Sequence, residues 1–389
     1  MALLIASSAI SQAAMMVAST ASTLLLARAA GEGSAGLPAA LGVAGNAAGS
    51  LLLTRVMQAR GRRSGLTYAY ATTTLGALVA LIGVTQWIPL VLLGMFVLGV
   101  GNAGAQLSRY AGAELVSSSR RGLALGAVVS AGAVGAIGGP VLLAPTAEVA
   151  RQTGLPALAG AFIAAAFGGV VATTAVASGG ALGDIGAAPR RSDPVRLASI
   201  PGLRAAVTGM VAAQAAMVAL MIAAPVDMDD RGHAMGAIGV VISIHVFGMY
   251  GLASLTGFLA DRIPAVRLLA GGLLILATSA AALMQSSHLT LPWFAVALFS
   301  LGYGWNVTVV AASTHIVRVV PQTIQMQVQG SVECLAWATS SVAALACTPV
   351  FALGGYQLLG LACLLLVAIT AAMRGKPHTR HEIKESCDA

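Results

Sequence analysis

The chain carries little charge. Asp, Glu, Lys and Arg make up 9% of its 389 residues, whereas hydrophobic residues make up 58%. Soluble domains contain about 25% charged residues, so this composition excludes a soluble protein. The formal net charge of +8 is distributed over short loops and a C-terminal tail. We therefore expect no nucleic-acid partner and attribute the positive excess to membrane topology.

Cysteine is also scarce, with four residues: Cys334, Cys347, Cys363 and Cys387. Their spacing does not match that of a metal finger. Cys334 and Cys347 lie on one expected helix, about 20 Å apart along its axis, which is too far for a disulfide. The chain also lacks a nucleophile–base set, a phosphate loop and a cofactor fingerprint. We therefore expect neither an enzyme nor a bound cofactor.

Long apolar runs fill most of the chain. A run of about 20 apolar residues is long enough to cross a bilayer as a helix. The sequence predicts twelve such helices, at 4–27, 36–56, 66–86, 89–111, 122–144, 156–178, 204–226, 235–259, 268–287, 291–314, 327–349 and 353–373. The expected fold class is therefore an all-α membrane protein with twelve transmembrane helices, in contact with the lipid bilayer. The first run lacks a charged leader and is too long for a signal-peptide core, so we interpret it as the first helix.

The basic residues predict the orientation in the membrane. An even number of spans puts both termini on one side. Placing that side in the cytoplasm leaves outside only three of the 21 Lys and Arg residues, namely Arg28, Arg151 and Arg231. This distribution follows the positive-inside rule. We therefore predict cytoplasmic N- and C-termini and a multi-pass protein of the inner membrane.

A polar stretch divides the expected spans into six and six. Residues 179–203 contain three arginines and three prolines, as is typical of a cytosolic linker. We therefore predict an N-terminal six-helix bundle at 1–178, a C-terminal six-helix bundle at 204–373 and a cytosolic tail at 374–389. A repeat of two halves places a transport cavity at their interface, near the middle of the bilayer.

A loop motif follows the eighth expected span, where Gly257, Asp261 and Arg262 lie in the sequence GFLADRIP. This segment resembles the loop signature of the major facilitator superfamily. In the corresponding loop of the first half, Gln58 occupies the position of the aspartate. A carboxylate at a helix end can bind basic residues and stabilise one state of a transporter. The resemblance thus implies a conformational contact in the second half and a weaker one in the first.

The fifth expected span contains Gly126, Gly135, Gly139 and Pro140. Their spacing resembles the glycine-rich helix-5 motif of the same superfamily. Glycines on one helix face permit close helix contact, and proline bends a helix. The motif is associated with antiporters, which favours export.

Two pairs of soft ligands lie on consecutive expected spans. Met217 and Met221 are four residues apart, and so are His245 and Met249. Residues at this spacing share a helix face, and three thioethers with one imidazole suit Cu(I) better than a hard cation. If the two faces meet, they form a copper path. The alternative is that the methionines are packing residues and that a backbone carbonyl satisfies His245.

The segment from Met217 to Asp261, which contains these four residues, and the run from Gly302 to Asn306 resemble the CcoA-like copper importers. That branch serves haem–copper oxidase assembly and includes riboflavin-transporting relatives. The resemblance implies copper import by alternating access, with Met217, Met221, His245 and Met249 as metal-handling residues. The tail could deliver copper to a cytosolic acceptor. The alternatives are a riboflavin or other organic-solute transporter, with Trp305 and Asn306 in contact with the solute, and a proton-coupled drug exporter.

Glu333 is the one acidic residue inside an expected span. A buried carboxylate in a membrane helix is a candidate proton carrier. Glu333 is therefore our candidate for proton coupling. The alternative is a structural acceptor that binds donors at helix ends.

Overall fold

The computed structural model describes residues 2–30, 37–178, 197, 200, 202–233 and 235–372. Its α-helices are α1 (Ala2–Ala30), α2 (Leu37–Thr85), α3 (Pro89–Glu114), α4 (Arg121–Val141), α5 (Leu143–Gln152), α6 (Ala159–Ser178), α7 (Leu203–Asp230), α8 (Met235–Tyr250), α9 (Ala253–Arg262), α10 (Ala265–Leu283), α11 (Leu291–Val319) and α12 (Gln322–Ala372). Two short 3₁₀ helices, η2 (Ser118–Arg120) and η5 (Ser286–His288), precede α4 and α11.

Two of these helices are long enough to cross a bilayer twice. The 49 residues of α2 would extend about 70 Å as one straight helix, against about 30 Å for the hydrocarbon core. The helix breaks at Gly61, where φ is 80° and ψ is 165°. Similarly, α12 breaks at Gly354 and Gly355, and Gly355 has a φ of 55°. Positive φ is accessible to glycine at little cost, so these residues make the turns between consecutive spans.

The residues that the structure describes provide twelve membrane spans once the break in α2 is counted. Length and composition identify eleven candidate spans in the described chain. One of them, Leu37–Thr85, is broken at Gly61 and is long enough to cross twice, which brings the number to twelve. Another candidate, Val240–Arg262, combines parts of α8 and α9. The predicted all-α fold with twelve transmembrane helices is thus confirmed.

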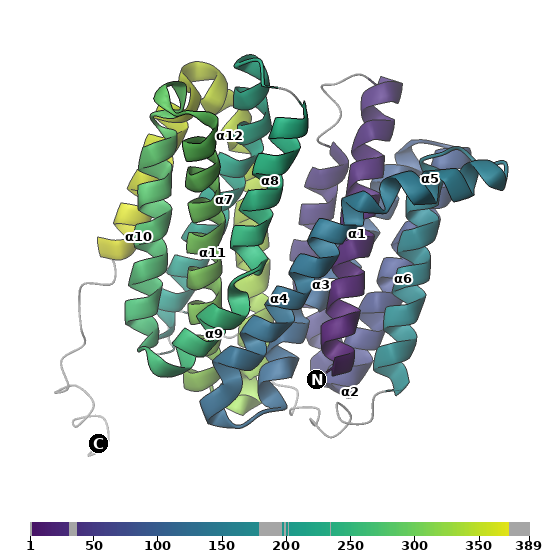
Figure 1. Cartoon of the computed structure of the whole chain (residues 1–389). Coiled ribbons are helices and arrows are strands. Elements are labelled where there is room, and N and C mark those ends of the chain that lie inside the picture. Colours follow the sequence, from purple (N-terminus) through teal and green to yellow (C-terminus); the bar gives the residue numbers. More distant parts are fainter. Residues whose placement is uncertain are drawn as a thin grey trace.

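The fifth span ends where the sequence predicts a bend. Helix α4 ends at Val141, directly after Pro140, and α5 starts at Leu143. Figure 1 shows α5 lying across the upper end of the bundle instead of continuing α4. The exposed side chains of Arg151 and Glu148 form an ion pair on this short helix.

Helices α1 to α6 form one half of the molecule and α7 to α12 the other (Figure 1). The second half has one large apolar core. The first half has two smaller ones, one of which also includes Val317 of α11 and Met326 of α12. Lipid is as apolar as these cores, so close packing holds membrane helices together more than burial does. Glycines permit such packing between α2 and α3. A Cβ at Gly45 of α2 would collide with the carbonyl oxygen of Phe96 of α3.

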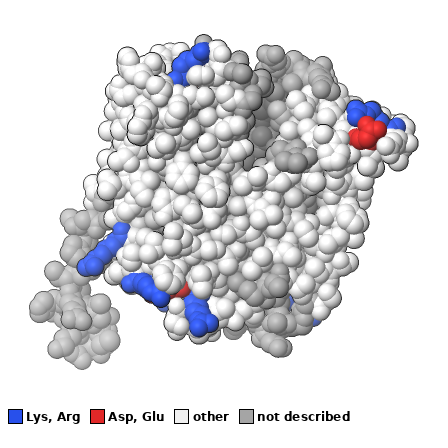
Figure 2. Space-filling model, in the orientation of Figure 1, with Lys and Arg blue, Asp and Glu red and all other residues white. Residues whose placement is uncertain are grey.

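Figure 2 shows one face of the molecule, with charged side chains near its upper and lower ends and almost entirely uncharged atoms between them. We call the lower end the basic end, and the sequence predicts that it is cytoplasmic. The predicted linker at 179–203 lies largely outside the described residues, and the predicted tail at 374–389, which includes Cys387, lies wholly outside them. The domain boundaries at these segments remain predictions.

Candidate functional site

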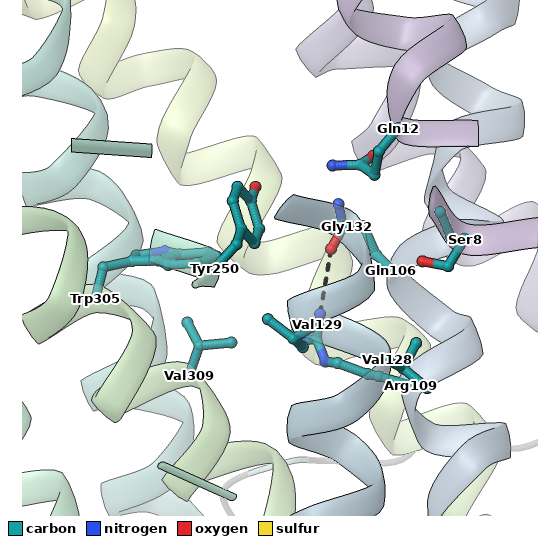
Figure 3. A pocket seen from close by; sticks show the side chains of 11 residues that line it. Ser8, Gln12, Gln106, Arg109, Val128, Val129, Gly132, Tyr250, Trp305 and Val309 are labelled. Atoms are coloured by element: carbon teal, nitrogen blue, oxygen red, sulfur yellow. Dashed lines mark hydrogen bonds between the residues drawn. The ribbon is translucent and has the colours of Figure 1, made fainter. Parts of the chain in front are cut away.

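A narrow, partly enclosed cavity lies between the two halves (Figure 3). Four helices of the two halves contribute most of its walls, and α8 contributes one residue. The lining residues are Ser8, Gln12, Ala105, Gln106, Arg109, Val128, Val129, Gly132, Tyr250, Trp305 and Val309. The position agrees with the interface at which a two-half repeat places its site.

One wall of the cavity is aromatic. Tyr250 is the last residue of α8 and packs edge-to-face on Trp305 of α11, with ring centroids 5.7 Å apart. The indole Nε1 of Trp305 donates a hydrogen bond to Gln214 Oε1 at 2.5 Å. This bond fixes the plane of the indole ring. The wall therefore offers an oriented aromatic surface to a bound molecule.

The opposite wall is polar. Figure 3 shows Gln12, Gln106 and Arg109 across the cavity from Trp305 and Tyr250. Arg109 NH1 donates to Gln106 Oε1 at 3.3 Å. Gln12 is 5% exposed, and its amide oxygen has no hydrogen-bond partner among the described residues. This wall can therefore both donate and accept hydrogen bonds.

An ion pair links the halves beside the cavity. Arg109 of α3 binds the carboxylate of Glu333 of α12 through NH2. The hydroxyl of Tyr110 donates to Glu333 Oε1 at 3.0 Å and lies 3.4 Å from Ser313 Oγ of α11. The side chains of Arg109 and Glu333 are 5% and 2% exposed. Each charge is thus withdrawn from solvent and neutralised by a residue of the other half.

The sequence analysis did not identify Arg109 as a site residue. It lies inside the span expected at 89–111, yet the topology count treated it as one of the cytoplasmic basic residues. The signal was present in the sequence, because an arginine within an apolar span needs a partner or a polar cavity. Glu333 meets the same requirement from the other half. Whether Glu333 also carries protons remains a prediction.

Asp261 joins the two halves at the basic end. Its carboxylate accepts hydrogen bonds from the backbone N–H groups of Gly122 and Leu123, both at 2.9 Å. It also accepts a bond from Arg318 NH2 at 2.9 Å. Gly122 and Leu123 belong to the first turn of α4, so the carboxylate lies where the helix dipole favours a negative charge. Asp261 thus binds α4 of the first half and α11 of the second.

The other residues of this loop motif have different surroundings. A Cβ at Gly257 would collide with the carbonyl oxygen of Gly122, so glycine is required for the contact of α9 with α4. Arg262 is exposed, and its guanidinium lies 3.4 Å from the centre of the Phe258 ring. Arg318 is therefore the basic residue that binds the motif's aspartate.

A second polar contact joins the halves at the basic end. Arg62 is 1% exposed, and its Nε donates to Glu114 Oε2 at 2.7 Å. Its NH2 donates to the amide oxygen of Gln329 on α12, also at 2.7 Å. In this half Gln58 occupies the position of the motif's aspartate. The contact with the other half is made by the Arg62 guanidinium and the neutral amide of Gln329, so this contact is not an ion pair.

The glycines of the fifth span allow α4 to contact both halves. A Cβ at Gly126 would collide with the carbonyl oxygen of Ala253 on α9. A Cβ at Gly135 would collide with the carbonyl oxygen of Ala9 on α1, and one at Gly139 would also press on α1. Figure 1 shows α4 running obliquely from the foot of the other half towards α1. Helix α4 therefore joins α9 at the basic end to α1 above it.

The four residues predicted to bind copper all lie in the second half. Met217 is buried in its core, whereas Met221 and Met249 are partly buried against that core. His245 is 1% exposed, and its Nδ1 lies 2.7 Å from the carbonyl oxygen of Leu298. Helices α7 and α8 each pack more extensively on α11 than on each other. The described contacts thus account for one ring nitrogen of His245, and the copper path remains a prediction.

Two six-helix halves that enclose a cavity and bind each other through polar contacts define a membrane transporter. The chain belongs to the Major Facilitator Superfamily, whose family model matches residues 2–346. It is therefore a multi-pass membrane transporter and not an enzyme.

Relatives of known sequence agree with this assignment. The chain is 32% identical over 368 residues to the uncharacterized MFS-type transporter YdeG of Bacillus subtilis, covering 88% of this chain and 84% of that protein. It is 26% identical over 291 residues to the riboflavin transporter RfnT of Brucella anthropi, covering 72% and 70% of the two chains.

Solved structures share the fold. A double-tryptophan mutant of XylE matches with a TM-score of 0.74 at 14% identity, covering 95% of this chain and 93% of that chain. The human organic anion transporter MFSD10 matches with a TM-score of 0.70 at 15% identity, covering 94% and 98%. At these identities the similarity concerns the fold alone.

Proposed function

We propose that this transporter imports a small organic solute with a planar aromatic ring system across the inner membrane, by alternating access of its two halves. The observation that carries the proposal is the composition of the cavity. Trp305 and Tyr250 form one wall, and Gln12, Gln106 and Arg109 form the other.

This arrangement suits an aromatic solute for two reasons. An aromatic ring packs well against Trp and Tyr, in offset-stacked or edge-to-face geometry. Ligand sites also combine apolar walls with a few polar groups that fix orientation, and the opposite wall supplies amide and guanidinium groups. The similarity to the riboflavin transporter RfnT supports a flavin as the first solute to examine, because the flavin ring is planar and carries several carbonyl oxygens.

Riboflavin uptake by riboflavin-requiring cells that express the chain tests the proposal. Removing the indole in Trp305→Ala should weaken solute binding by about 1–3 kcal/mol, or about 5- to 150-fold. Trp293 lies on the same helix but is 64% exposed, so Trp293→Ala is the matched control and should transport normally. Equal uptake by the two variants at equal protein level would place the solute elsewhere. Uptake at the level of empty cells would exclude riboflavin, and aromatic acids would be tested next.

Copper import is a second candidate function. The observation in its favour is His245, whose Nε2 is buried without a partner among the described residues, and neutral imidazole nitrogen is a good copper ligand. In this alternative, Met217, Met221, His245 and Met249 pass Cu(I) inward to a cytosolic acceptor.

Radiocopper uptake separates the two candidate functions. Met217→Leu with Met221→Leu conserves volume, so the protein should fold, but copper uptake should fall to background. Met210→Leu alters another buried methionine of α7 and is the control. Normal copper uptake by the double variant would exclude this path.

A further inference from the structure

We propose that Arg109 is the residue that binds an anionic group of the solute, and that Glu333 occupies the place of that group in the empty transporter. The solute class is then an aromatic carboxylate that enters with a proton. This inference rests on the proposed aromatic-solute function and adds the charge of the solute to it.

The hydrogen bonds of Arg109 leave donors for a ligand. A guanidinium has five N–H donors. In Arg109, NH2 contacts Glu333 and Tyr110, and NH1 makes a 3.3 Å bond with Gln106. Its Nε has no partner among the described residues. Arg109 also lines the cavity, so it can bind a carboxylate there in the two-pronged geometry that guanidinium groups favour.

Gln12 is a second, independent indication of a polar ligand. Its side chain is more than nine-tenths buried, lines the same cavity and has an amide oxygen without a partner among the described residues. Buried polar atoms are nearly always hydrogen-bonded. The amide group lies on the same wall as Arg109 (Figure 3), where it can bind a polar group next to the solute's carboxylate.

The charge balance of the site selects an anion. The guanidinium stays protonated in proteins, and an unpaired charge within the membrane is costly. A neutral solute cannot replace the carboxylate of Glu333 as the counter-charge of Arg109, whereas an anion can. Glu333, once separated from Arg109, then takes up one proton from solvent. The site thus gains one anion and one proton, and its net charge does not change.

Within the described part of the chain, few other ionisable groups face this pair. Tyr110 of α3 donates to Glu333, and Tyr250 of α8 lines the same cavity as Arg109. On α12, Gln329 lies one turn before Glu333 and contacts Arg62, whose charge Glu114 neutralises. Glu333 is therefore the acidic group of this cluster that exchanges its partner when an anion binds.

The test compares two probes that differ in charge. The full-length protein, in lipid nanodiscs, is titrated with 2-naphthoate and with 2-naphthamide between about pH 6 and about pH 8, where naphthoate stays ionised. If binding takes up one proton, the apparent Kd of naphthoate rises by up to about tenfold per pH unit. A pH indicator in weak buffer should register uptake of one proton per bound naphthoate. We expect naphthamide to bind weakly and without proton uptake.

Variants assign the effect to the two residues. Glu333→Gln should bind naphthoate more tightly, without proton uptake and without pH dependence, because the competing carboxylate is gone. Glu148→Gln changes an exposed glutamate and should retain both properties. Arg109→Gln alone leaves Glu333 buried without its counter-charge and can impair folding. The double variant Arg109→Gln with Glu333→Gln avoids this charge and should lose its preference for naphthoate over naphthamide.

The outcomes separate this inference from the proposed function. Equal binding of the two probes without proton uptake would overturn the role of Arg109 and Glu333 but leave an aromatic-solute transporter. Proton uptake that persists in Glu333→Gln would overturn the role of Glu333. If folded protein binds neither probe, the inference fails, and riboflavin uptake then decides the aromatic-solute function separately.

Discussion

Replacing Asp261 with asparagine should open the basic end of the transporter. The carboxylate accepts two hydrogen bonds from the N-terminus of α4 and one from Arg318. Asp261→Asn conserves size but removes the charge. The NH2 group of the new amide is a donor, so it cannot accept a hydrogen bond from a backbone N–H group. The change therefore acts on this contact with little effect on the packing around it.

The expected magnitude follows from the burial of the partners. A hydrogen bond to a charged group contributes about 1.5–3 kcal/mol. Arg318 is 32% exposed, so its ion pair adds only about 0–1 kcal/mol. Asparagine retains one acceptor, so we expect the substitution to lower the stability of the closed state, relative to the open one, by about 2–4 kcal/mol. This corresponds to about a 30- to 800-fold shift towards states in which the basic end is open.

Pulsed electron paramagnetic resonance can measure this shift. Spin labels at Ser119 and Gln322 report on the two halves, because both residues are exposed at the basic end, and the native cysteines are replaced beforehand. Asp261→Asn should add a population at longer distance. Arg267→Gln removes an exposed charge from the same half and should leave the distribution unchanged. A distribution that stays unchanged in folded Asp261→Asn protein would refute the assignment of Asp261 as a contact that closes this end.

Two further substitutions test the packing and the second polar contact. Gly257→Ala should lower the thermal unfolding temperature because its Cβ would collide with the carbonyl oxygen of Gly122, whereas Gly271→Ala, whose Cβ would meet nothing within 4 Å, should not. Arg62→Leu leaves the mostly buried Glu114 without its partner and should destabilise the protein by about 3–5 kcal/mol. Adding Glu114→Leu should restore most of that loss, as measured by thermal unfolding in nanodiscs. Failure to restore it would show that Arg62 acts chiefly through its contact with the other half.

The transmembrane architecture could be predicted because it depends on local properties. Span length follows from bilayer thickness, and the composition of each run is visible without knowledge of its neighbours. The breaks between spans were predicted in part: Gly61 lies between the helices expected at 36–56 and 66–86, whereas Gly355 lies inside the span expected at 353–373. Both glycines adopt positive φ. The boundary of α6 differs by three residues from the prediction at its start, as is usual for helix ends.

The site was less predictable because its contacts are not local. Arg109 and Glu333 are 224 positions apart, and nothing near either residue indicates the other. Each is an intramembrane charge that needs a partner, so the two could have been paired by that requirement. The motif at Asp261 predicted a basic partner, but the adjacent Arg262 is exposed, and Arg318 of α11 binds instead. Only the packing of helices decides between such candidates.

The contacts between the halves differ in their relation to a solute. Asp261 and Arg62 do not line the cavity, whereas Arg109 does. A ligand shifts a conformational equilibrium only through interactions that differ between the two states. Of these three contacts, the Arg109–Glu333 pair is thus the one that a solute in the cavity can weaken directly. The contacts of Asp261 and Arg62 then impose a constant cost on opening the basic end, loaded or empty. Because an anion removes only the inner ion pair, it lowers the total cost of opening without abolishing it, and opening becomes dependent on loading. In the proposed mechanism, the Arg109–Glu333 pair alone makes the loaded carrier open more readily than the empty one, and the constant contribution of the Asp261 and Arg62 contacts keeps opening of the empty carrier rare.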